Sequence, residues 1–252
     1  MSMLAIIERD LRNFFKYKYW IIILLITNLA DLLIMAASFS NLVTEVAIIS
    51  DYLRFFAPGI TVLSLFGATF IMGIEVSQER HTQRIHYLLS LPIDRFQFIV
   101  ARALAGAIRS MIFSTPLLII TIIMIGFQSF LGLILVIGTL FMLAMGLTSL
   151  SIILATAIQN TRNYQLVRGF VSIWLMFGST VFYPREVMAN IPGMRIIADL
   201  NPLSYGANIL RGLLDPTYAG IIRTLDILGL LIFSSLMMYF GLYFYNRFTK
   251  IT

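Results

Sequence analysis

Long apolar runs separated by short polar segments dominate the chain, and their lengths and spacing are typical of membrane-crossing helices. WIIILLITNLADLLIMAA begins at Trp20, and LGLILVIGTLFMLAMGLTSLSIILATAI begins at Leu131. A helix of about 20 apolar residues crosses the ~30 Å hydrocarbon core of a bilayer. The pattern predicts six such helices, over residues 20–38, 56–74, 106–127, 130–157, 168–183 and 222–245.

The composition agrees with a membrane location. Hydrophobic residues make up 59% of the 252 residues and charged residues only 12%, against about 25% charged residues in soluble domains. The chain has no cysteine, which excludes disulfides and cysteine-based sites. The first apolar run starts only near Trp20, so no cleavable signal peptide is predicted. We therefore predict an all-α integral membrane protein, with residues 1–252 in one six-span domain.

The net charge of +6 is explained by orientation in the bilayer rather than by nucleic-acid binding. With both ends of the chain inside, thirteen of the eighteen Lys and Arg residues fall in inward-facing segments and five in outward-facing ones. Positive residues favour the cytoplasmic side of a membrane. We therefore predict a plasma or inner membrane protein with cytoplasmic termini and no nucleic-acid partner.

Residues 1–19 are predicted to form an amphipathic helix at the cytoplasmic interface. Charged and polar residues fill one of its faces. The other face carries apolar residues at helical spacing, namely Leu4, Ile7, Leu11, Phe14 and Phe15. Aromatic residues from Tyr17 to Trp20 would anchor the turn into the membrane. A soluble helix packed on a partner is the alternative.

The polar segment between the second and third spans, ERHTQRIHYLLSLPIDRFQFIVAR (79–102), is longer than a simple connection needs. Its first half mixes apolar and basic residues as an amphipathic helix does, and Pro92 is expected to end that helix at Leu91. Asp94 suits the N-cap of a second helix that runs through Arg102 into the third span. The segment 77–97 therefore contains a separate helix over residues 79–92, which either docks a cytoplasmic partner or only covers the bundle.

Two motifs resemble those of the ATP-binding-cassette (ABC) type-2 exporter permease family. ER…IHYLLSLPIDR resembles its cytoplasmic coupling segment, and NPLSYGANILRGLL (201–214) resembles the segment before its last span. Gln83, Arg84 and His86 depart from the residues usual in that family. The resemblance covers essentially the whole chain. It implies that ATPase docking uses Glu79, Arg80, Arg84, Ile85, His86, Leu88, Leu89 and Pro92.

The resemblance further implies a half-exporter. Two six-span subunits, identical or paralogous, would pair in the lipid bilayer above two separate ABC ATPase subunits. The chain lacks the G-x-x-x-x-G-K-[ST] loop that cradles nucleotide phosphates. ATP and Mg are therefore expected on the ATPase, with no cofactor, metal or catalytic residue on this chain, which is then no enzyme itself. Outward movement of the cargo is what the resemblance implies, and the short outer loops favour an amphipathic or hydrophobic cargo over a long polymer.

The outer segment 184–218 is too polar to span the membrane and too apolar for a free loop, and four prolines interrupt it. We predict two short helices that dip into the outer leaflet, since broken backbone at that depth must be covered by protein. By resemblance this is the re-entrant outer hairpin of the family, with motif residues Asn201, Pro202, Tyr205 and Arg211. Arg211 is most simply a structural arginine, hydrogen-bonded to carbonyls or to an acid.

Several charged residues fall near or inside the predicted spans. Asp31 either faces a pathway or partner, or reaches water near the outer end, because a carboxylate at mid-bilayer costs about 2.5–3.5 kcal/mol. Arg102 and Arg109, seven residues apart on one helix face, either snorkel to head groups or form an electropositive inner vestibule. The same two interpretations, snorkelling or an inner vestibule, apply to Arg162 and Arg168.

Aromatic residues supply further candidates for a dimer seam between the second and fifth spans. These are Phe66, Phe70, Phe170, Trp174 and Phe177. Lipid contact and ordinary helix packing are the alternative for each of them. Glycines in the same two spans would allow close approach of helices, and these are Gly67, Gly73, Gly169 and Gly178.

Three other functions remain open. An intramembrane enzyme would need a nucleophile–base pair or metal ligands, but His81 and His86 are the only histidines and no H-E-x-x-H or G-x-S-x-G motif occurs. A channel or carrier that works without an ATPase would need ionisable residues at mid-span, where Asp31 is nearly alone. A non-transporting sensor or assembly subunit is compatible with the departures from the coupling motif.

Overall fold

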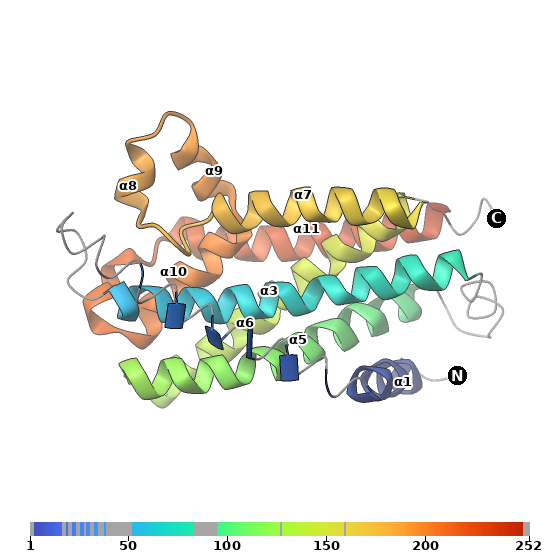
Figure 1. Cartoon of the computed structure of the whole chain (residues 1–252), viewed down its shortest axis with the longest axis horizontal. Helices are drawn as coiled ribbons and strands as arrows, with labels where there is room; N and C mark the ends of the chain where they lie inside the picture. Colours follow the sequence, from blue (N-terminus) through green and yellow to red (C-terminus); the bar gives the residue numbers. More distant parts are fainter. Residues whose placement is uncertain are drawn as a thin grey trace.

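The structure is a bundle of long helices that lie side by side, with short helices gathered at one end (Figure 1). This computed structural model describes residues 3–16, 19, 22–23, 26–27, 29–30, 33–34, 38, 52–82, 95–126, 128–158 and 160–248. All regular secondary structure among these residues is helical. Helix α1 and the C-terminal end of α11 lie at the end of the bundle opposite the short helices.

Four helices of the described part are long and apolar enough to cross a membrane. They are α3 (Tyr52–His81), α5 (Arg95–Ile125), α6 (Phe130–Ala157) and α11 (Thr224–Phe248). They correspond to the predicted spans 56–74, 106–127, 130–157 and 222–245, and α6 has the predicted bounds. Most of the first predicted span, including Asp31, lies outside the described residues.

Helices α3 and α5 extend farther than the apolar runs that predicted them. Helix α5 begins at Arg95, so the prediction of a helix start directly after Asp94 is confirmed. Helix α3 continues to His81, so the prediction that Glu79 begins a separate helix is wrong. The hydropathy pattern ends α3 too early because its last turns carry charged residues, which neighbouring helices neutralise.

The fifth predicted span has different bounds from those expected. Helix α7 covers Thr161–Phe177, 17 residues, and turns follow where the prediction placed helix up to residue 183. Two local signals set these ends. The side chain of Asn160 accepts a hydrogen bond from the backbone of Arg162 and so caps the start, and Gly178 is the C-cap. The apolar run alone carries neither signal.

The outer segment folds into more helix than predicted. It contains α8 (Arg185–Ala189), α9 (Met194–Leu200), α10 (Pro202–Leu214) and the 3₁₀ helix η2 (Pro216–Ile221). Arg185 forms an ion pair with Asp199 and joins α8 to α9. Helix α10 is buried over most of its length and packs on α3, α6 and α11. Two short helices were expected, and α10 adds a longer, buried one.

Helix α3 is the centre of the bundle and α11 its periphery. In the most apolar 18 residues of each helix, 83% of α3 is buried against 17% of α11. Helix α3 packs on α5, α6, α7 and α10. Its approach to α6 is close at Gly73, whose N–H donates to the Ser151 hydroxyl at 3.0 Å. Forces on α3 therefore reach most of the bundle.

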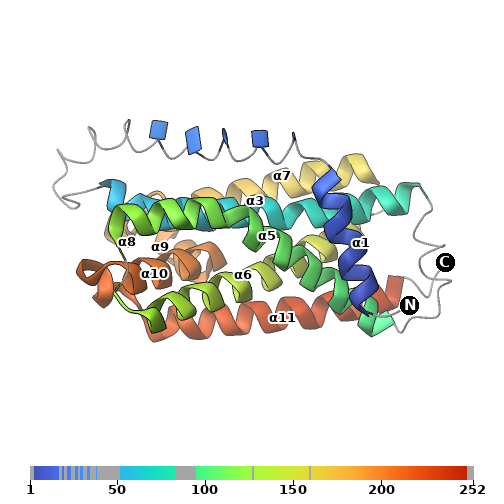
Figure 2. The same cartoon turned by 90° about the horizontal axis from the view of Figure 1, so that it is seen from below.

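Helix α1 (Met3–Lys16) lies crosswise to the long axis of the bundle and packs on α5 (Figures 1 and 2). Its buried face consists of Ile6, Asp10 and Phe14. Leu4 is 75% exposed, as an apolar face turned toward the membrane interface allows, whereas the burial of Asp10 departs from the predicted polar face. The hydropathy pattern places Asp10 on the polar face, but an arginine of α5 draws its carboxylate into the protein.

Gly73 provides a test of the α3–α6 packing. A Cβ atom at this position would lie 2.2 Å from the Ser151 hydroxyl and 2.3 Å from the Tyr164 hydroxyl. We expect Gly73→Ala to lower the free energy of unfolding by about 1–3 kcal/mol, as overpacking does. SDS-induced unfolding in mixed micelles would measure it.

The control is Gly67→Ala in the same helix, where no atom lies within 4 Å of the new Cβ. Alanine favours helix over glycine by about 1 kcal/mol, so the control should be neutral or stabilising. Equal effects of the two substitutions would show that α3 and α6 do not meet at Gly73.

Candidate functional site

Six charged side chains form a cluster where α1, α3 and α5 meet. This charge cluster consists of Arg9, Asp10, Glu75, Glu79, Arg102 and Arg109. It has three positive and three negative groups and is formally neutral. Within the described part of the chain, no group of three or more His, Cys, Asp or Glu is placed to hold a metal ion. The cluster is therefore built from ion pairs.

The pairs between α3 and α5 follow from helix geometry. Glu75 and Glu79 lie one turn apart on α3, and Arg102 and Arg109 lie two turns apart on α5. Arg109 donates to both carboxylate oxygens of Glu75, at 2.8 and 3.1 Å. Arg102 donates to Glu79. Two acids on one helix thus meet two bases on its neighbour.

Helix α1 joins the same cluster through its buried acid. The carboxylate of Asp10 lies 3.6 Å from Nε of Arg102, and Arg9 donates to Asp10 at 2.7 Å. Arg9 also lies 3.7 Å from the Glu79 carboxylate. The crosswise helix is therefore held to the ends of both long helices by charge as well as by apolar contact.

Both arginines of α5 are buried, with Arg102 2% and Arg109 1% exposed. The Met72 sulfur lies between them, 3.7 Å from Nη2 of Arg102 and 3.6 Å from Nη2 of Arg109. The Phe98 ring lies 5.6 Å from the Arg102 guanidinium, within range of a cation–π contact. The structure thus contradicts the snorkelling interpretation, and their pairing with acids does not favour an electropositive vestibule.

The last turn of α3 also binds the end of α6. Arg80 donates to the carbonyl of Thr156 at 2.6 Å, where the C-terminal carbonyls of α6 attract positive charge. Two residues assigned to ATPase docking, Glu79 and Arg80, therefore have partners inside the chain. The others, Arg84, Ile85, His86, Leu88, Leu89 and Pro92, lie outside the described residues. Docking of the ATPase here stays a prediction.

A second polar centre surrounds Arg211 at the other end of α3. Its guanidinium donates to the carbonyls of Phe55, Thr180 and Val181, each at 2.9 Å. The centre of the Phe55 ring lies 3.6 Å from this guanidinium. Burial lowers the pKa of Arg211 to about 9, so the side chain keeps its charge at neutral pH. The predicted structural arginine bonded to carbonyls is confirmed.

The remaining motif residues of the outer segment hold α10 in place. The Asn201 side chain caps α10 by accepting from the N–H of Leu203, and it donates to the carbonyl of Leu175 at the end of α7. Pro202 occupies the first turn, where its missing N–H costs nothing. Tyr205 packs against Gly229 of α11, where any Cβ would meet the ring. The motif therefore joins α7, α10 and α11.

The candidate seam residues divide into two groups. Phe66 and Phe70 form an edge-to-face pair on α3 and are buried within the chain, which favours the helix-packing alternative for these two residues. Phe170, Trp174 and Phe177 are exposed on α7. We call these three residues the α7 face. No atom lies within 4 Å of a Cβ at the neighbouring Gly169, so a second helix could approach closely.

The sequence interpretation missed Asp10 and Glu75 as functional residues. A signal for Glu75 was present, because acids spaced i, i+4 at the end of one span face bases spaced i, i+7 at the start of the next. Asp10 gave no such signal, since one charged residue among several on an amphipathic helix is ordinary.

Two comparisons with known proteins bear on these features. The model of the family described as ABC-2 type transporter matches residues 1–214. A protein of Cyanophora paradoxa named "Putative transport permease ycf38" is 28% identical over 165 residues, 64% of this chain. The match spans 56% of that relative's own length. The matched family region includes the charge cluster and the Arg211 centre.

The Glu75–Arg109 pair should respond unequally to removal of its two partners. The Arg109 side chain is 2% exposed and Glu75 is 31% exposed. Glu75→Met leaves a buried cation alone and should lower the free energy of unfolding by about 3–5 kcal/mol. Arg109→Met should lower the free energy of unfolding by less, because the remaining Glu75 carboxylate reaches water. The double variant should regain most of the stability that Glu75→Met loses. SDS-induced unfolding of the four proteins gives the double-mutant cycle.

The matched control is the exposed pair of Glu8 and Arg12 on α1, whose side chains are 68% and 72% exposed. Glu8→Met should change stability by less than about 1 kcal/mol. A Glu75 variant as mild as this control would mean that the charge cluster does not hold α3 to α5.

Proposed function

The chain belongs to the ABC-2 type transporter family, and from that membership we propose that it is the permease subunit of an ABC exporter. As a member of this family it is the non-catalytic membrane subunit of a transporter. The proposal adds that transport is outward and driven by a separate ATPase, and that the cargo is amphipathic or hydrophobic. Family membership is the observation that carries the proposal, and the charge cluster suggests how force from a partner would reach the membrane helices.

A partner must supply the energy. The chain contains no G-x-x-x-x-G-K-[ST] loop to cradle nucleotide phosphates. ATP and Mg therefore bind to the partner ATPase in this proposal. The segment 83–94 connects α3 to α5 and carries the apolar residues Leu88 and Leu89 next to basic ones, which suits a groove on such a partner.

The charge cluster explains how a push on this segment would reach the membrane. One end of the segment leaves α3 beside Glu79, and the other enters α5 shortly before Arg102, the residue that binds Glu79. Arg80 adds a link to α6. A force on the segment would therefore move α1, α3, α5 and α6 together instead of bending one loop.

A second subunit, identical or paralogous, would complete the pathway. The α7 face presents Phe170, Trp174 and Phe177 outward, and helix pairs in membranes favour close approach at glycine, as at Gly169. A seam of this kind would place apolar and aromatic groups along the route of the cargo. This supports an amphipathic or hydrophobic cargo rather than a highly charged one.

The orientation of the chain can be tested without background labelling, because it has no cysteine. We expect Ser2→Cys to react with an impermeant maleimide only after the membrane is opened, since the N-terminus is cytoplasmic. Arg195→Cys, on the exposed part of α9, should react in intact cells. Mass shifts of the purified chain measure both.

The reverse pattern would contradict both the orientation and the outward direction of transport. Labelling of both positions in intact cells would instead indicate leaky membranes, which a cytosolic cysteine protein detects in the same experiment.

The docking role is tested with the double variant Leu88→Asp/Leu89→Asp, co-expressed with the candidate ATPase. Charge in place of both apolar side chains should abolish co-purification of the ATPase and its stimulation in liposomes. The control Leu88→Ile/Leu89→Ile keeps the apolar area and should retain both activities. Size-exclusion chromatography checks that each variant folds and inserts.

If the Asp variants still bind and stimulate the ATPase, the segment is not the docking helix. A chain for which no ATPase co-purifies in any form would favour a non-transporting sensor or assembly subunit, or a channel that works without ATP.

A further inference from the structure

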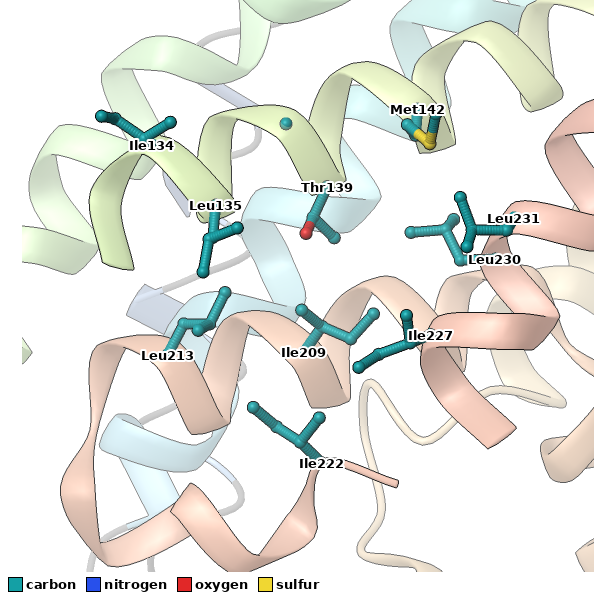
Figure 3. Close-up of a pocket in the computed structure, with 11 residues that line it drawn as sticks. Ile134, Leu135, Thr139, Met142, Ile209, Leu213, Ile222, Ile227, Leu230 and Leu231 are labelled. Atoms are coloured by element: carbon teal, nitrogen blue, oxygen red, sulfur yellow. The ribbon is translucent and has the colours of Figure 1, made fainter. Parts of the chain in front are cut away.

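An apolar pocket of about 440 Å³ lies between α6, α10 and α11 (Figure 3). This acyl pocket, as we name it, is separate from the charge cluster and shares no residue with the α7 face. Side chains from α6 line one wall, and side chains from α10 and α11 line the opposite wall. Its volume lies within the range of roughly 300–1,000 Å³ that small-ligand sites have.

The lining of the acyl pocket is almost wholly aliphatic. Ile209 and Leu230 are buried and form its inner part. Leu135, Ile227 and Leu231 are 40–49% exposed, so the pocket is open at the surface of the protein. Thr139 supplies the hydroxyl among otherwise apolar side chains. Such a lining offers little to a polar ligand, and an apolar cavity does not hold water well.

The depth of the pocket restricts what can fill it. Its walls include α6 and α11, both long and apolar enough to cross the membrane. Residues from the first turns of α11, such as Ile227 and Leu231, place it near one surface of the hydrocarbon core. Hydrocarbon chains of lipids are the abundant apolar molecules at that depth.

An exposed arginine directly follows a residue that lines the pocket. Ile222 lines the pocket, and the next residue, Arg223, is exposed just before α11 begins at Thr224. The nearby acid Asp226 is turned inward, where it accepts from Asn208 and from the backbone of Arg223. An exposed arginine that directly follows a pocket residue could bind a phosphate attached to a hydrocarbon chain in the pocket.

We propose that the acyl pocket binds one acyl chain of a membrane phospholipid, with the phosphate of its head group at Arg223. The bound chain fills the space between α6 and the α10–α11 pair and completes the packing of the outer segment on the bundle. The site requires the membrane location of the chain and is independent of the ATPase and of the cargo.

The test uses the full chain, co-expressed with its ATPase, in nanodiscs that contain phosphatidylglycerol with a photoreactive diazirine in one acyl chain. Mass spectrometry of peptides maps the cross-links. We expect the cross-links to concentrate on residues 134–142 and 227–231, with a yield well above that on the exposed face of α5. Gly138→Trp should lower them about tenfold, because the indole displaces several methylenes from the pocket.

Gly138 suits this experiment because no atom lies within 4 Å of a Cβ there. The control is Ile123→Trp, at the outer end of α5, where the native side chain is 77% exposed and does not line the pocket. It adds the same side chain to a lipid-facing surface and should leave the cross-links unchanged. If Gly138→Trp fails to fold, Leu231→Trp blocks the pocket from the opposite wall.

The head-group part of the proposal is tested by comparing phosphatidylglycerol with diacylglycerol that carries the same photoreactive chain. The native protein should cross-link the phosphate-bearing lipid preferentially, and Arg223→Gln should remove that preference.

Three results would overturn the proposal. Cross-links at the pocket no stronger than those on α5 would show that lipid contacts it only as it contacts any surface. Cross-links that persist in both Trp variants would exclude the pocket as their origin. Formation of a disulfide between two copies of a Leu135→Cys variant would assign the pocket to a second copy. Lipid cross-linking needs no ATP, so it tests the acyl pocket even if the chain does not transport a cargo.

Discussion

An arginine buried in a membrane protein must meet an acid or a set of carbonyls, and this requirement shapes both ends of the bundle. At one end Arg102 and Arg109 meet Glu79 and Glu75. At the other end Arg211 meets backbone carbonyls of α3 and of the turn after α7. An unpaired charge at these depths would cost several kcal/mol. The three arginines therefore fix the contacts of α3 near its two ends, while apolar side chains pack its middle.

Because of the same requirement, α3 is bonded to its neighbours at both ends and could transmit movement between them. Its first turns are bonded to the outer segment through Arg211, and its last turns are bonded to α1, α5 and α6 through the charge cluster and Arg80. Ion pairs of this kind resist separation, so displacement of the His81 end of α3 would be carried along the helix. An ABC-2 permease needs such a connection, because the proposed ATPase acts below the membrane and the outer segment lies at the far end.

The surfaces of the molecule divide into regions with different proposed partners. Apolar and basic residues of the segment 83–94 suit an ATPase, the α7 face suits a second permease subunit, and the acyl pocket suits a phospholipid. The α7 face lies on α7 and the acyl pocket on α6, α10 and α11, while segment 83–94 lies outside the described residues. Each partner could therefore bind without displacing another, and lipid in the acyl pocket would support the outer segment during movement of α3.

The sequence by itself determined the helical class, the positions of α3, α5, α6 and α11, and the two family motifs, because apolar run length and motif spacing are local properties. It also assigned Arg211 a structural role correctly. Only the tertiary structure decided that Asp10 faces inward, that Phe66 and Phe70 are buried, and that Arg102 and Arg109 are neutralised by acids. Burial and pairing depend on which helices become neighbours, and a single helix's hydropathy does not contain that information.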